Sequence, residues 1–359
     1  MGPPSHFQGP ARGLSLSAPD LLLRIPPFIR YPNAMTGQLS GPPGMECRVL
    51  GLFRKTLIGK GRAGVAFGAD HVALAVMRRD GGQPVLERCE VLPLGPGTGA
   101  DASQAAVRAA GIPRMPISTV LSPKDYQLAL VEAPEVPPAE LRAAMRWRLK
   151  DSIDFRVEDA VIDVFEVPDQ SRGSHGRMMY AVAARRSAVD THTQALAGSP
   201  GFDAIDVPEL CLRNLAALLP MASAGVALLH LGESTASIVL VRGKTFYLAR
   251  QVELFPADAK AADGREGRIN AAGVVLELQR SLDYYERHFD QPPITRIAVS
   301  PAGARADELA RELGRETGFE VAALDLNVLL SCKTPIEESA QASCLLAVGA
   351  ALREEHRSL

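Results

Sequence analysis

Two glycine turns between short apolar strands carry the side chains best suited to binding a ligand. The turns begin at Gly68 and Gly232, each directly after an apolar strand. The polar residues that follow them are Asp70, Ser234 and Thr235. Amides in such turns can approach a phosphate closely, and neighbouring carboxylates can hold Mg²⁺. The residue types therefore suit a magnesium-bound nucleoside triphosphate, provided that acids stand at the right positions.

Each turn belongs to a repeated pattern of strand, glycine turn, strand, hairpin and strand. The first copy covers 64–89, with its hairpin at 80–82. The second copy covers 226–249, with its hairpin at 242–244. Glycine-containing hairpins between apolar runs predict antiparallel meanders. The repetition predicts two lobes with the same strand order.

Helices and further strands follow each meander. Apolar residues at every fourth position predict a helix that starts near Pro137 and reaches Ile153. The other predicted helices are 186–197, 271–289, 306–317 and 339–353, and the other strands are 160–167, 178–184, 294–300 and 319–324. A meander followed by alternating helices and strands, twice over, describes an actin-like, ribonuclease H-like duplicated α/β fold.

The pattern divides the chain into a tail and two lobes. Proline-rich residues 1–50 lack apolar periodicity and are predicted to be a disordered tail. The first lobe is expected at 51–220, with an inserted subdomain at about 115–170, and the second at 221–355. No apolar run approaches the roughly 20 residues that span a bilayer, and no signal peptide is expected.

Composition excludes several classes of function. The 39 basic and 41 acidic residues give a net charge of -2, which does not favour a nucleic-acid or membrane-binding protein. Five scattered cysteines without Cys-x-x-Cys spacing argue against a disulfide framework and a zinc site. The sequence also lacks a Gly-x-Ser-x-Gly elbow, a P-loop and a His-Glu-x-x-His helix. The glycine-rich segment 95–99 is interpreted as a linker.

Several segments resemble one family. Residues 134–141, 145–148, 282–286 and 347–353 are similar, in order and spacing, to PilM-type proteins of type IV pilus assembly. The resemblance extends over 52–355, and the branch most similar to it is MshI of mannose-sensitive haemagglutinin pilus systems. The wider superfamily includes the cell-division protein FtsA. The resemblance implies an actin-like fold.

The resemblance also implies a location and a partner. Such proteins are cytoplasmic, lie at the inner membrane, and hold the N-terminal tail of a bitopic PilN-type protein between the first subdomain and the inserted one. A tail of this kind binds by filling apolar pockets. The implied docking region contains Leu141, Met145, Trp147 and Leu149, and self-association is also possible. The cations Arg142, Arg146 and Lys150 suit either a solvated helix surface or a docking face for an acidic tail.

ATP-binding members of this family use two Asp-x-Gly turns, and this chain departs from both. Ala66 and His230 stand where the carboxylates belong. The resemblance thus implies a degenerate nucleotide cleft, whose members would be Gly68, Asp70, Gly232, Ser234, Thr235 and Gly303. We expect no catalytic residue, metal or cofactor, and no ATPase activity. The alternative is an ATP-binding actin-like protein or weak ATPase of cell division, pilus assembly or type II secretion, with Asp70 or Glu233 replacing the missing acids.

Overall fold

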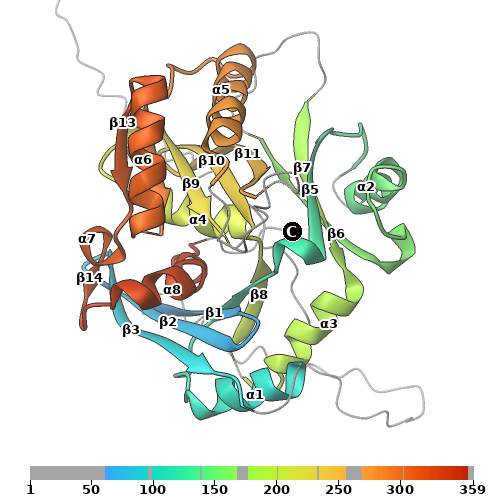
Figure 1. Cartoon of the computed structure of the whole chain (residues 1–359). Coiled ribbons are helices and arrows are strands. Elements are labelled where there is room, and N and C mark those ends of the chain that lie inside the picture. The colour runs from blue at the N-terminus through green and yellow to red at the C-terminus, as the bar shows by residue number, and fades with distance from the viewer. Residues whose placement is uncertain are drawn as a thin grey trace, which may run out of the picture.

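The computed structural model describes residues 61–95, 99–137, 140–167, 177–199, 201–232, 234–255, 269–301 and 303–354. The predicted tail at 1–50, the expected start of the first lobe and Glu233 lie outside these residues. The described part forms layers of helices and sheets, with a smaller subdomain at one side (Figure 1). None of its helices is long and apolar enough to cross a membrane.

The first large sheet contains the expected meander and two parallel strands. In spatial order it consists of β14 (Ser331–Cys332), β3 (Gln83–Pro93), β2 (His71–Asp80), β1 (Gly61–Phe67), β4 (Ile117–Val120) and β8 (Phe202–Asp206). Strands β1 to β3 pair antiparallel, whereas β4 is parallel to β1 and β8 to β4. Strand β2 is buried from Val72 to Met77, which explains its continuous apolar run.

The second large sheet repeats this order. It consists of β11 (Thr245–Glu253), β10 (Thr235–Arg242), β9 (Val226–Leu231), β12 (Arg296–Ser300) and β13 (Glu320–Ala323). The registers also correspond, because Phe67 pairs with Val72 in the first sheet and Leu231 pairs with Ala236 in the second. The predicted duplicated α/β fold is confirmed.

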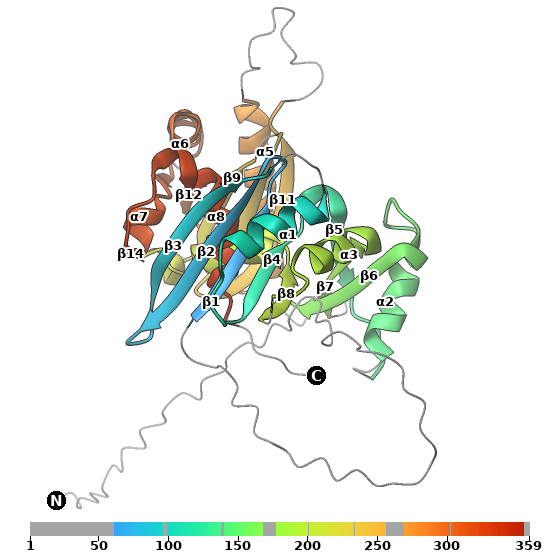
Figure 2. The ribbon, with the colours of Figure 1, turned by 90° about the horizontal axis from the view of Figure 1, so that it is seen from below.

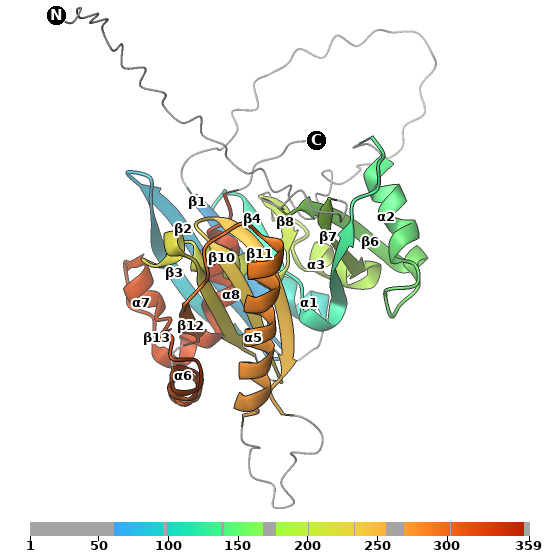
Figure 3. The same cartoon turned by 90° about the horizontal axis from the view of Figure 1, so that it is seen from above.

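Helices cover both sheets and fill the space between them (Figures 1 and 3). On the outside are α1 (Ala100–Ala109) and α3 (Arg186–Ala195) beside the first sheet, and α5 (Ala271–His288) and α6 (Ala304–Thr317) beside the second. Between the sheets lie α4 (Pro208–Ala216) and α8 (Glu338–Ala351), which pack on each other. Helix α6 ends at Gly318 in the left-handed conformation, as its sequence predicts.

The two inner helices are exchanged between the lobes. Helix α4 follows the first lobe's strands but packs on β9, β10 and β11, whereas α8 follows the second lobe's strands but packs on β1 and β2. Two glycines permit this approach. A Cβ on Gly64 would overlap the carbonyl oxygen of Ala347. A Cβ on Gly349 would lie 2.5 Å from the carbonyl oxygen of Cys211. The lobes are therefore joined by buried helix packing.

The inserted subdomain has different boundaries from those predicted. Its sheet has the order β5 (Tyr126–Glu132), β7 (Met178–Arg185), β6 (Ala160–Glu166), and α2 (Leu141–Leu149) covers one face (Figure 2). Strand β4 belongs to the first large sheet, and β7 is the central strand of the small one. The subdomain thus runs from about 126 to 185, not 115 to 170. An apolar strand signals burial, but not the sheet to which it belongs.

Candidate nucleotide cleft and docking helix

The two glycine turns are closed by equivalent backbone hydrogen bonds. The N–H of Gly68 donates to the carbonyl of His71, and the N–H of Gly232 donates to that of Thr235, both at 2.9 Å. Each bond closes a tight turn between the first two strands of a meander. The duplication therefore extends to individual hydrogen bonds.

The polar residues of the turns face solvent or their own neighbours. The carbonyl of Asp70 accepts from the N–H of Leu94, and that of Ser234 accepts from Leu254, both at 2.8 Å. The Asp70 carboxylate is 91% exposed and lies 2.8 Å from His71 Nδ1, a hydrogen bond that lowers the pKa of Asp70. Asp70 is thus paired with its neighbour at the surface.

Ala66 and His230 occupy equivalent positions in the two lobes. Ala66 lies opposite Val120 of β4, and His230 lies opposite Ser300 of β12, with 3.4 Å between His230 Nδ1 and Ser300 Oγ. Burial lowers the pKa of His230 to about 4, so its imidazole is neutral at neutral pH. Mg²⁺ prefers oxygen ligands, above all carboxylates. Ala66 and His230 therefore do not fit a magnesium triphosphate.

The other members of the predicted cleft, Gly232, Ser234, Thr235 and Gly303, carry no carboxylate of their own, and Glu233 lies outside the described residues. Ser234 is exposed, Thr235 is half-buried, and Gly303 precedes α6 with a φ of 137°. A Cβ on Gly303 would lie 3.4 Å from a carboxylate oxygen of Glu338. Within the described ranges, no group of three or more His, Cys, Asp and Glu side chains is suited to a metal ion.

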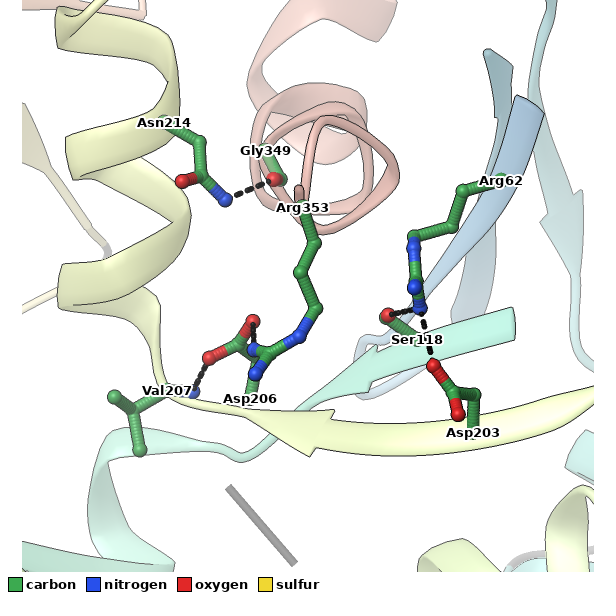
Figure 4. Close-up of polar contacts among 8 residues, drawn as sticks. All are labelled: Arg62, Ser118, Asp203, Asp206, Val207, Asn214, Gly349 and Arg353. Carbon is green, nitrogen blue, oxygen red and sulfur yellow. Dashed lines mark hydrogen bonds and ion pairs between the residues drawn. The ribbon is translucent and has the colours of Figure 1, made fainter. Parts of the chain in front are cut away.

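A buried ion pair lies at the carboxyl edge of the parallel strands (Figure 4). Asp206 ends β8 opposite Val120, two strands from Ala66. Its carboxylate lies 2.5 Å from Arg353 Nη1, and both side chains are at most 1% exposed. The same carboxylate accepts from the N–H of Val207 at 3.2 Å. The acid at this edge is therefore neutralised by the chain itself.

A second buried cation lies beside this pair. Arg62 donates to Ser118 Oγ at 2.8 Å and to Asp203 Oδ2 at 2.9 Å. A register shift in the pairing of β4 with β8 inserts Asp203 as an extra residue, and bulges of this kind re-aim side chains. Burial lowers the pKa of Arg62. Neither ion pair could be predicted from the sequence. The Asp-Val-Pro-Glu segment at 206–209 indicates only that a strand ends and a helix begins there.

Glu209 connects three parts of the molecule. On α4, its carboxylate accepts from the hydroxyl of Tyr126 in the inserted subdomain at 2.6 Å and lies 3.5 Å from Gln251 Nε2 of β11. Burial raises the pKa of Glu209. Nearby, the hydroxyl of Tyr180 donates to the carbonyl of Tyr247 at 3.2 Å. Protein contacts thus hold the inserted subdomain against the second lobe.

The four predicted docking residues do not form one surface. Met145 and Leu149 are fully buried and pack on the small sheet, while Leu141 is half-buried at the same cluster. Trp147 lies on the outer face of α2 and is 77% exposed. Among the four, only Trp147 presents its side chain freely to a partner.

The cations of α2 have different surroundings. Arg142 Nε lies 3.0 Å from Asp163, and Arg146 donates to the carbonyl of Val157 at 2.6 Å. These two contacts attach the helix to its own subdomain. The ammonium of Lys150 lies 6.0 Å from the centre of the Trp147 ring. The outer face of α2 thus presents an aromatic ring beside a cation.

A buried histidine should make stability depend on pH. His192 Nδ1 lies 3.0 Å from Thr119 Oγ1, and burial lowers the pKa of His192 to about 4. In the unfolded chain the imidazole of His192 is protonated near pH 6.5. Its contribution to the free energy of unfolding is therefore complete above that pH and is lost as the pH drops toward 4. We expect protonation of His192 alone to lower the free energy of unfolding by about 3 kcal/mol between pH 7 and pH 4.

Urea unfolding of the parent and of a His192→Gln variant at pH 7 and pH 4 measures the contribution of His192 to the pH dependence of stability. The loss on acidification should be about 3 kcal/mol smaller in the variant, which cannot bind the proton. Equal losses in the two proteins would contradict the assignment.

The fold and the site together define the class. The protein is an α/β protein of actin-like fold, with two lobes, an inserted subdomain, and Ala66 and His230 before its two glycine turns. No protein-family model matches the chain, and no curated protein matches its sequence.

One solved structure has a similar fold over most of its length. A chain of the "PilM-PilN type IV pilus biogenesis complex" is 23% identical, with a TM-score of 0.61 over 81% of this chain and 98% of that chain. The predicted resemblance to PilM-type proteins is thus confirmed in the fold, without distinguishing the MshI branch.

Two more distant matches are a Bacteroides thetaiotaomicron protein with an actin-like ATPase fold and the cytoplasmic domain of EpsL. The Bacteroides protein is 8% identical, with a TM-score of 0.48 over 82% of this chain and 100% of its own. EpsL is an inner membrane component of the type II secretion system of Vibrio cholerae. Its cytoplasmic domain is 15% identical, with a TM-score of 0.39 over 70% of this chain and 93% of that chain.

Proposed function

We propose that this protein is a PilM-type scaffold of a pilus assembly platform. It would act in the cytoplasm, at the inner membrane, by binding the N-terminal tail of a bitopic PilN-like protein. The observation that supports this most is a PilM-like fold in which Ala66 and His230 occupy the two positions where the family resemblance implies acids. A scaffold needs the architecture of the fold but not its magnesium ligands.

The contacts between the lobes support a function without nucleotide turnover. The Arg353 ion pair, the Glu209 hydrogen bonds and the exchanged inner helices link the two lobes and the inserted subdomain. Because these contacts are buried, they hold the lobes together without a ligand. The protein would therefore present one stable surface to its partner.

Trp147 is the residue we assign to partner contact. A large aromatic side chain that is 77% exposed on the outer face of the inserted subdomain is typical of a binding hot spot. It is also the only tryptophan of the chain, so its fluorescence reports on this surface alone.

Tryptophan fluorescence tests the proposal directly. The probe is a tryptophan-free peptide of the first ~20 residues of a single-span protein encoded beside this gene, a length that a short docking site can bury. Adding it should shift the emission, and Trp147→Ala should weaken binding at least about tenfold, measured by calorimetry. Leu276→Ala is the matched control, since Leu276 is an exposed apolar residue on α5 and should leave affinity unchanged.

Two outcomes would overturn the proposal. One is the absence of binding to any such tail. The other is micromolar binding of ATP that disappears when Mg²⁺ is removed, which would favour the ATP-dependent alternative. The scaffold predicts no binding of ATP and Mg²⁺ in the same calorimeter, and no effect of ATP on tail affinity.

A further inference from the structure

The outer face of α2 carries an aromatic ring beside a cation. Helix α2 lies on the outer side of the inserted subdomain (Figures 1 and 3), and Lys150 is its C-cap, three positions after Trp147. Helical side chains three apart are neighbours and lean toward the N-terminus, so Lys150 reaches back toward the ring. Its ammonium lies 6.0 Å from the ring centre, and the ring is 77% exposed. The two residues form one surface feature, the Trp147–Lys150 site.

The other cations of this helix are engaged within the subdomain. Residues 141–150 contain no acid and four cations, which are Arg142, Arg146, Arg148 and Lys150. Arg142 and Arg148 form ion pairs with acids of β6 and β5, and Arg146 donates to backbone carbonyls. Within the described ranges, no carboxylate lies at ion-pair distance from Lys150. The exposed charge of Lys150 is therefore the one that α2 offers to a partner.

The site combines two kinds of recognition. The residues four and three positions before Trp147 are Ala143 and Ala144, whose small side chains leave the ring 77% exposed. An exposed ring can bury an apolar side chain of a partner. An ammonium group has only hydrogen-bond donors, and its bonds to a carboxylate are about twice as strong as neutral ones. The chemistry that completes the site is thus an apolar side chain next to an acidic one.

We infer that the tail bound by this protein carries an acidic side chain, which pairs with Lys150 while a neighbouring apolar side chain packs on Trp147. The inference rests on the proposed function, because it concerns the same tail, and it adds the chemical class that the site selects. A tail with a basic side chain at that position would be repelled by Lys150. The cation would thus distinguish one tail from another, whereas the ring supplies most of the affinity.

The surroundings of Lys150 favour a peptide carboxylate over an anionic bilayer. Helical faces that lie on membranes present a broad apolar surface bordered by several cations. Here one ring and one free cation are presented, and the next residue, Asp151, is an exposed acid. An extended negative surface would meet Asp151 together with Lys150, whereas a single carboxylate can approach Lys150 alone.

The test compares two peptides in calorimetry with the full chain. One is the tryptophan-free tail peptide described above, and the other is the same peptide with every Asp replaced by Asn and every Glu by Gln. We expect the parent to bind the acidic peptide about three- to tenfold more tightly. Added salt should reduce this difference.

Variants of the protein assign the effect to one side chain. Lys150→Gln should weaken binding of the acidic peptide by the same factor and should no longer distinguish the two peptides. Arg280→Gln is the matched control, because Arg280 is 66% exposed on α5 and its replacement removes the same charge elsewhere. This control should bind both peptides as the parent does.

The outcomes separate this inference from the proposed function. Equal affinities for the two peptides, or a Lys150→Gln variant that still distinguishes them, would overturn the inference alone, provided that Trp147→Ala weakens binding. A tail that lacks acids and binds through Trp147 would do the same. Absence of binding to any tail would overturn both. Two other occupants would also contradict the inference: vesicles of phosphatidylcholine and phosphatidylglycerol that shift the Trp147 emission without peptide, and a dimer that Trp147→Ala abolishes in sedimentation.

Discussion

Replacing Asp206 with asparagine should lower the free energy of unfolding by about 3–5 kcal/mol. The substitution keeps the size of the side chain but leaves the Arg353 guanidinium buried without its opposite charge (Figure 4). A buried charge without its counter-charge costs several kcal/mol, whereas an exposed ion pair contributes little. Urea unfolding followed by circular dichroism measures the difference.

An exposed pair provides the control for this change. Arg315 contacts Glu312 on the surface of α6, and Arg315→Ala should change stability by less than about 1 kcal/mol. A double variant, Asp206→Leu with Arg353→Met, removes both charges and should recover much of the loss. If Asp206→Asn lowered the free energy of unfolding as little as Arg315→Ala does, the ion pair would not contribute to joining α8 to the first sheet.

Replacing Gly64 with alanine should destabilise the protein by about 3 kcal/mol or more, at the upper end of overpacking effects. The added methyl group would overlap the carbonyl oxygen of Ala347 and lie 2.7 Å from the amide nitrogen of Ala351. Both are backbone atoms of a helix, so neither can rotate away, and α8 must move off β1. Thermal and urea unfolding both report the loss.

Gly95→Ala is the matched control for this prediction. Gly95 has no neighbour within 4 Å of an added Cβ. Its replacement by alanine should therefore change the free energy of unfolding by less than about 0.5 kcal/mol. Comparable losses at the two positions would mean that the contact between β1 and α8 is looser than the structure indicates.

The helices and strands could be predicted because their signals are local. The expected helix at 271–289 is α5 (Ala271–His288), and the two meanders occur where glycine turns indicated. The fourfold spacing on α2 also identified the buried side chains of Met145 and Leu149. The same spacing could not identify a docking surface, because it marks the face that packs inside.

Contacts between distant residues could not be predicted. Asp206 and Arg353 are 147 positions apart; Asp206 ends strand β8, and Arg353 follows the end of α8. Strand β14 lies beside β3 only because the chain returns to the first sheet after the second lobe. Sheet membership of β4 and β7 likewise depends on topology, since both are simply apolar in sequence.

The exchange of inner helices has a consequence for synthesis on the ribosome. Domains commonly fold in order from the N-terminus as the chain emerges. Here the face of β1 and β2 that α8 covers stays open until α8 (Glu338–Ala351) has been made, which is after the strands of both large sheets. The first lobe to be translated is therefore completed only when α8 arrives, and until then its apolar inner face is exposed to aggregation.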